Sequence, residues 1–130
     1  MKQKYKVIVE DDIIDPPKPH ELKAALIIAS YFRQDIIFLR TGNGKAPDLN
    51  INGVIWEIKS PKGGSKNTME NNIREATKQS RNIIIDLNRC KLSNEAALIR
   101  IKGYLKNTKR HIPNVLVIKK GNIVIDITGK

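Results

Sequence analysis

Residues 47–59 read PDLNINGVIWEIK, and this stretch decides the fold because it predicts a β-hairpin with a fixed register. Asn52 and Gly53 stand between two alternating runs, and an Asn-Gly pair favours the positive φ angles of a two-residue type I′ turn. A turn at this point places Asp48 directly opposite Glu57. Since side chains two residues apart share a face of a strand, Lys59 is expected on the same side as Glu57.

The opposed Asp48 and Glu57 have two interpretations. Like charges directly opposite each other in a sheet, with Cβ atoms about 5 Å apart, are destabilising. A divalent cation such as Mg²⁺ would compensate, because it binds through one or two carboxylates and leaves positions for water and phosphate oxygens. Lys59 would then stabilise charge on a phosphate or activate a water. The other interpretation is a solvent-exposed polar face of an ordinary hairpin, in which Lys59 screens the two acids.

The pattern Pro47-Asp48 followed by Glu57-Ile58-Lys59 resembles the PD-(D/E)xK signature of the restriction-endonuclease-like nuclease superfamily. Over residues 21–118 the sequence is also similar to the tRNA-cleaving C-terminal toxin domains of contact-dependent growth inhibition systems, which use that fold. The matching segments are Glu21, PDLNINGVIWEIKSP and NNIREATKQSRNIIIDL. The resemblance implies an α/β fold of the restriction-endonuclease-like type, with a mixed central sheet flanked by helices.

The resemblance also implies a metal-dependent endonuclease. In that enzyme Asp48 and Glu57 would be ligands of Mg²⁺ or Mn²⁺, and Glu21 would be a supporting ligand. Lys59 would orient water or stabilise charge, and Gln79, at the end of the helix that follows, would support Lys59 or a substrate phosphate. The choice of tRNA rests on the resemblance. The resemblance is also the basis for three further expectations: an acidic immunity protein as partner, delivery as the C-terminal part of a larger secreted or surface protein, and action in the cytoplasm of a target cell.

The charge distribution fits a protein that acts on a polyanion. The chain has 130 residues and a net charge of +11, and residues 61–130 hold 15 Lys/Arg against 5 Asp/Glu, whereas residues 1–60 hold 9 against 8. A broad positive surface attracts nucleic acid, but the excess alone fits a tRNA binder, a DNA binder or an acidic protein partner equally. The candidate phosphate contacts are Lys45, Lys62, Lys66, Arg74, Lys78, Arg81, Lys102 and Lys106.

Composition and length indicate one domain, which is expected over residues 20–130 after an N-terminal strand and Pro-rich connector over residues 1–19; the resemblance implies that it is the nuclease domain. No apolar run approaches the roughly 20 residues of a membrane span. The single cysteine, Cys90, excludes an internal disulfide and a multi-cysteine zinc site.

Hydrophobic periodicity predicts strands and helices packed as a mixed sheet with helices on it. Strands are expected at residues 5–10, 35–39, 82–87, 115–118 and 123–127, and helices at 20–33, 68–80 and 93–108. The core side of the first helix is predicted to be Leu22, Ala25, Leu26 and Ala29, extended by Ile28 and Phe32. For the helix at 68–80 the predicted core side is Met69, Ile73, Ala76 and Ser80.

Three alternatives to a tRNA-cleaving metalloenzyme remain open. The same fold with the same metal site would serve a DNA endonuclease. His111 would suit a metal-independent ribonuclease, since histidine works as general acid or base near neutral pH; His20 is assigned to the start of a helix instead. A non-catalytic nucleic-acid-binding module would explain the charge but leave the opposed Asp48 and Glu57 without a role.

Overall fold

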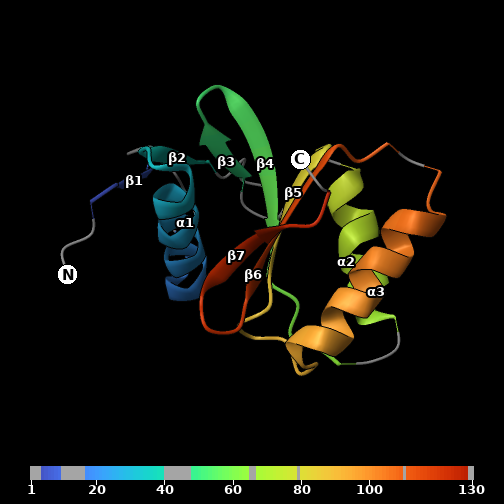
Figure 1. Ribbon diagram of the computed structural model, residues 1–130. Helices are drawn as coiled ribbons and strands as arrows, with labels where there is room; N and C mark the ends of the chain where they lie inside the picture. The colour runs from blue at the N-terminus through green and yellow to red at the C-terminus, as the bar shows by residue number, and fades with distance from the viewer. Residues whose placement is uncertain are drawn as a thin grey trace.

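The computed structural model describes residues 4–9, 17–39, 48–64, 67–78, 80–109 and 111–128, and within them seven strands form one sheet in chain order (Figure 1). The strands are β1 (Val7–Val9), β2 (Ile36–Leu39), β3 (Asp48–Ile51), β4 (Val54–Lys59), β5 (Asn82–Asp86), β6 (Asn114–Lys119) and β7 (Ile123–Asp126). β1 pairs with β2, β4 with β5, and β5 with β6 in parallel, whereas the other three pairs are antiparallel. The predicted mixed α/β architecture is confirmed.

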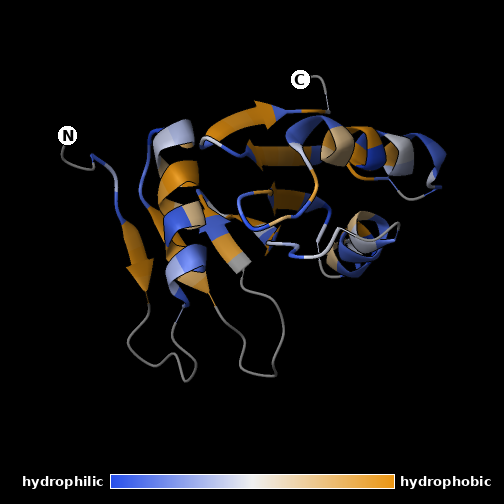
Figure 2. Ribbon diagram, turned by 90° about the horizontal axis from the view of Figure 1, so that it is seen from below, coloured by the Kyte–Doolittle hydropathy of each residue, from blue (hydrophilic) through white to orange (hydrophobic). Residues whose placement is uncertain are grey.

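Helices cover both faces of this sheet. One face packs against α1 (Pro19–Phe32), and the other packs against α2 (Thr68–Thr77) and α3 (Asn94–Asn107). The two layers are visible on either side of the strands in Figure 1, and the strands between them are mostly hydrophobic in Figure 2. Two separate apolar clusters result, one on each face.

The hairpin has the predicted register. Asp48 pairs with Glu57, Leu49 with Trp56, and Ile51 with Val54. The turn residues Asn52 and Gly53 have φ angles of 53° and 85°, as a type I′ turn requires. The side-chain Oδ1 of Asn50 accepts a hydrogen bond of 2.8 Å from the Gly53 amide, which closes the turn.

The predicted central strand is buried from both sides. Ile84 packs in the cluster under α1, whereas Ile83 and Ile85 pack in the cluster under α2 and α3. A strand with parallel neighbours on both sides and helices on both faces has no polar face to offer, which explains its run of three isoleucines.

The predicted core side of α1 is partly wrong. Its buried residues are Glu21, Ala24, Ala25, Ile28 and Ala29. Leu22 and Leu26, predicted to be core, instead line a groove of about 840 Å³ beside Tyr31 and β7. The helix has two apolar stripes, and the one rich in alanine lies against the sheet because small side chains let the helix approach closely.

Several boundaries of strands and helices also differ from the predicted ones. The first strand is Val7–Val9, so Tyr5 and Lys6 of the predicted range 5–10 precede it, while Glu10 lies outside the described residues. The helix α2 ends at Thr77, so Ser80 lies beyond it. The Ser80 hydroxyl donates to the Ile55 carbonyl (3.1 Å) and accepts from the Asn82 amide (3.0 Å), and these bonds tie the segment after α2 to β4 and β5. By contrast Ser93 starts α3 as predicted, because its side chain caps the Ala96 amide. The division at residue 19 stays a prediction.

Replacement of Gly53 by alanine tests the turn. No atom lies within 4 Å of a Cβ built on Gly53, so the cost comes from the positive φ alone, and Gly53→Ala is expected to lower the free energy of unfolding by about 1–2 kcal/mol. Gly103, inside α3, also has open space around its Cβ, and Gly103→Ala is expected to stabilise by about 0.5–1 kcal/mol. Urea denaturation of both variants measures this difference, and an unchanged Gly53→Ala midpoint would contradict the turn type.

Candidate active site

Glu57 is a fully buried acid in the middle of the sheet. It lies on β4, it is 0% exposed, and it pairs with Ile83 on the parallel neighbour β5. Ile83 belongs to the α2–α3 cluster, whereas Trp56 and Ile58, on either side of Glu57, pack in the cluster under α1. The Glu57 side chain therefore lies on the α2 side of the sheet.

Lys59 is on the same face, one side-chain repeat nearer the end of β4. It is half-buried and pairs with Ile85. Two residues of strand separate it from Glu57 by about 7 Å along the chain. Asp48 is the first residue of β3, and its backbone pairs with Glu57, while its side chain is outside the described structure. The fold thus brings the three predicted positions of the signature onto two adjacent strands.

Glu21 approaches from the other layer. It lies in the first turn of α1, which packs on the face opposite Glu57, and it is 8% exposed. Its Oε1 accepts a hydrogen bond of 2.8 Å from the Lys18 amide in a capping box. A role in capping the helix is therefore present in the structure, and a role as third metal ligand stays a prediction.

A polar cluster lies where α1 begins and β5 ends. Nη1 of Arg89 is 2.5 Å from Nε2 of His20, and Asp86, the last residue of β5, is 2% exposed. Oδ1 of Asp86 accepts hydrogen bonds from the backbone amide (3.1 Å) and side-chain amide (3.0 Å) of Asn88. Because Lys59 pairs with Ile85, the residue before Asp86, this cluster and Lys59 both lie at the carboxyl ends of the parallel strands β4 and β5.

Sequence reasoning missed this cluster. It placed His20 at a helix start, which is correct, but assigned no role to Asp86 or Arg89. His20 lies far along the chain from Asp86 and Arg89, and the one available signal was an acidic residue at the carboxyl end of a buried parallel strand, where functional side chains gather in α/β folds.

The cluster favours a neutral His20. Burial and the Arg89 guanidinium lower the pKa of His20 below 6.5, and the carboxylates of Glu21 and Asp86 act in the opposite direction. A neutral ring can accept the Arg89 hydrogen bond at Nε2, which a protonated ring cannot.

The metal-ligand set as a whole is not tested by the described side chains. Among them, no group of three or more His, Cys, Asp and Glu residues is arranged to hold a metal ion. The Asp48 side chain is not among those side chains, so the predicted set of Asp48, Glu57 and Glu21 remains a prediction.

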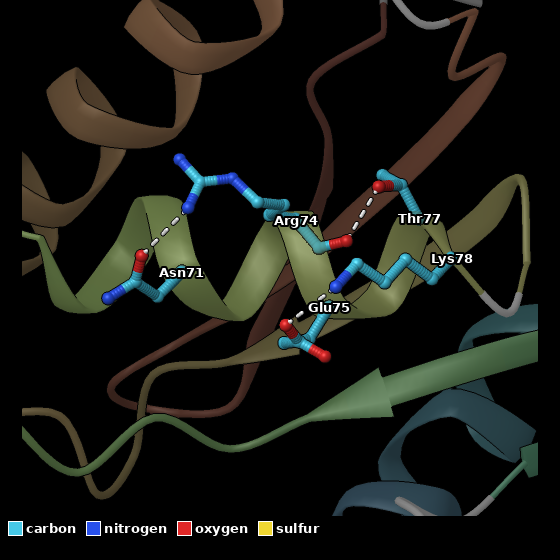
Figure 3. A network of polar contacts seen from close by, with 5 residues as sticks. All are labelled: Asn71, Arg74, Glu75, Thr77 and Lys78. Atoms are coloured by element: carbon cyan, nitrogen blue, oxygen red, sulfur yellow. Dashed lines mark hydrogen bonds and ion pairs between the residues drawn. The ribbon is translucent and has the colours of Figure 1, made fainter.

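The predicted nucleic-acid contacts are on the surface wherever they are described. Exposed positions are Lys62, Arg74, Lys78, Arg81, Lys102 and Lys106. On α2, Arg74 Nη1 donates to Asn71 Oδ1 (3.2 Å) and Lys78 forms an ion pair of 3.2 Å with Glu75 (Figure 3). Lys45, Lys66 and Gln79 lie outside the described residues. The helices of the described structure include none long and apolar enough to cross a membrane.

Residues 45–124, which contain the hairpin, Glu57, Lys59, α2 and α3, match the model of the contact-dependent growth inhibition CdiA C-terminal domain. The chain belongs to this family. As a CdiA C-terminal domain it has a toxin function in contact-dependent growth inhibition, and the part of the sequence-based resemblance that concerned this family is confirmed.

The fold of this CdiA C-terminal domain is similar to that of a solved structure, the CdiA-CT/CdiI toxin and immunity complex from Burkholderia pseudomallei. The TM-score is 0.59 with 20% sequence identity, and the alignment covers 94% of this chain and 98% of that one. A comparison with curated proteins gave no match.

The lowered pKa of His20 predicts a pH dependence of stability. The folded protein binds fewer protons at this site than the unfolded chain, so stability is present above pH 6.5 and is lost as the pH falls below that value. His20→Gln keeps an acceptor for Arg89 but does not titrate, and should flatten the thermal midpoint between pH 7.5 and 5.5 in metal-free buffer. His111→Gln, at an exposed histidine, is the control and should keep the wild-type slope. An equal slope in wild type and His20→Gln would contradict the assignment.

Proposed function

We propose that this CdiA C-terminal domain is a metal-dependent endonuclease of the PD-(D/E)xK type that cleaves phosphodiester bonds of tRNA. One observation carries the proposal: Glu57 is fully buried in the sheet and in register with Asp48, with Lys59 on the same face. An ordinary polar hairpin face would be exposed to solvent, and Glu57 is not.

The residues present fit a hard divalent cation. An ionised carboxylate in an apolar interior is costly unless a cation or hydrogen-bond donors compensate it. Glu57 is 0% exposed, and its strand neighbour Asp48 brings a second carboxylic acid to the same register position. Oxygen donors of this kind suit Mg²⁺ or Mn²⁺ rather than zinc, which prefers nitrogen and sulfur. Asp48 and Glu57 are the proposed ligand pair, and Glu21, whose helix packs on the opposite face of the sheet from Glu57, is not needed for it.

The chemistry is divided between the two acids and Lys59. The metal, when bound, would polarise the scissile phosphate and lower the pKa of a water. Asp48 and Glu57 would hold it in place. Lys59 is half-buried and nearer the end of β4 than Glu57, so a phosphate arriving from solvent meets its ammonium group first. That positive charge stabilises the extra negative charge that develops on phosphorus oxygens in the transition state.

The substrate and partner are proposed on different grounds. Exposed cations on the loop after β4, on α2 and on α3 provide the non-specific attraction that a polyanion needs. The choice of tRNA rests on the similarity of residues 21–118 to tRNA-cleaving toxin domains. The solved relative is a toxin and immunity complex, which supports an immunity protein as partner, acidic here because it must cover a basic toxin. Delivery as part of a larger protein and action in the target-cell cytoplasm complete the proposal.

Substitution of Lys59 by methionine tests the catalytic assignment. Purified wild type incubated with total tRNA and Mg²⁺ is expected to give discrete fragments that vanish in EDTA, and Lys59→Met should lower the cleavage rate by about 10²–10³-fold. Lys23→Met, at an exposed lysine on α1, is the matched control and should cleave like wild type. Cleavage that survives EDTA would overturn the metal-dependent mechanism. Cleavage of duplex DNA but not of tRNA would overturn the assignment of tRNA as the substrate.

Substitution of Asp48 by asparagine tests the metal by a readout other than activity. In EDTA, Asp48→Asn should raise the free energy of unfolding by up to about 1 kcal/mol, because it removes one of two charges opposed in register. Wild type should gain about 2.7 kcal/mol when Mg²⁺ is present at 100 times its Kd, and the variant should gain much less. Identical Mg²⁺ responses in both proteins would exclude Asp48 as a ligand.

A further inference from the structure

A second site lies on the outer side of the two helices that cover Glu57. The surface between α2 and α3 forms a groove of about 680 Å³, which is within the range of small-ligand sites. Its lining combines two cations, one acid, one phenol, one amide and one exposed aliphatic side chain: Arg74, Arg100, Glu70, Tyr104, Asn107 and Ile99.

The acid in this groove is poorly satisfied. Glu70 Oε1 is 3.9 Å from Arg100 Nη1, at the outer limit of an ion pair. Glu70 Oε2 is buried and has no hydrogen-bond partner among the described residues. Leaving a buried acceptor unpaired destabilises the folded protein. A change of Glu70 rotamer about its Cβ–Cγ bond would carry the carboxylate, and with it both oxygens, toward a ligand in the groove. A ligand with two adjacent donors would recover this free energy.

The other lining residues fit a nucleotide. Tyr104 is half-buried and Ile99, which also lines the groove from α3, is 72% exposed, so a flat base has an aromatic ring and an apolar side chain to pack against. The Arg74 guanidinium donates one of its five N–H groups to Asn71, and it projects from the exposed side of α2 (Figure 3). A phosphate is the natural partner of an exposed guanidinium next to a base site.

We propose that this groove binds a guanine nucleotide of the RNA substrate, an inference that rests on the proposed function. Guanine is the base whose Watson–Crick edge has two adjacent donors, N1–H and the N2 amino group, and these match the two oxygens of Glu70. Adenine and cytosine present an amino donor next to an acceptor, and uracil presents one N–H between two carbonyls, which a carboxylate repels. Tyr104 stacks on the base and Arg74 pairs with the phosphate.

The position of the groove links base recognition to the active site. α2 packs on β4 and β5, and the Glu57 and Lys59 side chains lie on this face of the sheet. RNA held in the groove is therefore on the same side of the sheet as Glu57 and Lys59. A guanine fixed there would set which phosphodiester bond reaches Lys59.

Nucleotide binding to the whole chain in EDTA tests the proposal without cleavage. Calorimetric titration with GMP, AMP, CMP and UMP is expected to show GMP binding at least 10-fold more tightly than the others. Glu70→Gln should abolish this preference, and Tyr104→Leu should weaken all four nucleotides about 10-fold. Glu75→Gln is the matched control, because Glu75 lies on the same helix but pairs with Lys78 and does not line the groove. Equal binding of the four nucleotides, or an unchanged preference in Glu70→Gln, would overturn the proposal.

The outcomes separate this proposal from the proposed function. If the chain cleaves no nucleic acid but binds GMP in a Glu70-dependent manner, the nuclease proposal fails and the groove stands. If Lys59→Met abolishes cleavage while Glu70→Gln changes neither GMP binding nor the pattern of tRNA fragments, the groove proposal fails alone. Thermal unfolding of Glu70→Gln, expected to stay cooperative with a midpoint close to that of wild type because glutamine has the same shape as glutamate, shows that any loss of binding is not loss of the fold.

Discussion

The register of the β3–β4 hairpin is the constraint on which the rest of the structure depends. A type I′ turn at Asn52 and Gly53 fixes which residues of the two strands are opposite, and the side-chain period of two then decides their faces. A slip of one residue would exchange the faces of β4, placing Glu57 against α1 and Trp56 against α2. β5 pairs with the other side of β4, and residues in register share a face, so the faces of β4 also match those of the central strand β5.

Features coded within a few residues could be predicted, and features that depend on packing between layers could not. The turn, the isoleucine strand β5 and the Ser93 cap of α3 each follow from a local signal of two to four residues. The buried side of α1 does not. Leu22 and Leu26 give it an apolar stripe as good as that of its alanines, and only the closeness of the helix to the sheet decides that the smaller side chains are buried.

The same distinction holds for the candidate site. The proximity of Glu57 and Lys59 could be predicted because both lie on one strand, where a spacing of two places them on the same face. The proximity of His20 to Asp86 and Arg89 could not be predicted, because the start of α1 meets the end of β5 only through the order of strands in the sheet. Glu21 illustrates both cases: its inward direction was predicted from helical spacing, but its hydrogen bond to the Lys18 amide is a local alternative to metal binding.

The helix α2 lies between the proposed active site and the proposed base-binding groove. Met69, Ile73 and Ala76 fix its inner side in the cluster that lies on the Glu57 face of the sheet, and Glu70 and Arg74 are carried on its outer side. Helical periodicity leaves little freedom here, since residues one position from a buried side chain must point about 100° away from it. Packing that shields the buried acid therefore also orients the groove. A helix is only about 10 Å across, so an RNA strand that occupies both places has to curve closely around α2. Flexible single-stranded segments bend in this way at low cost, whereas a rigid duplex does not, and the geometry thus favours an unpaired loop or end of the substrate.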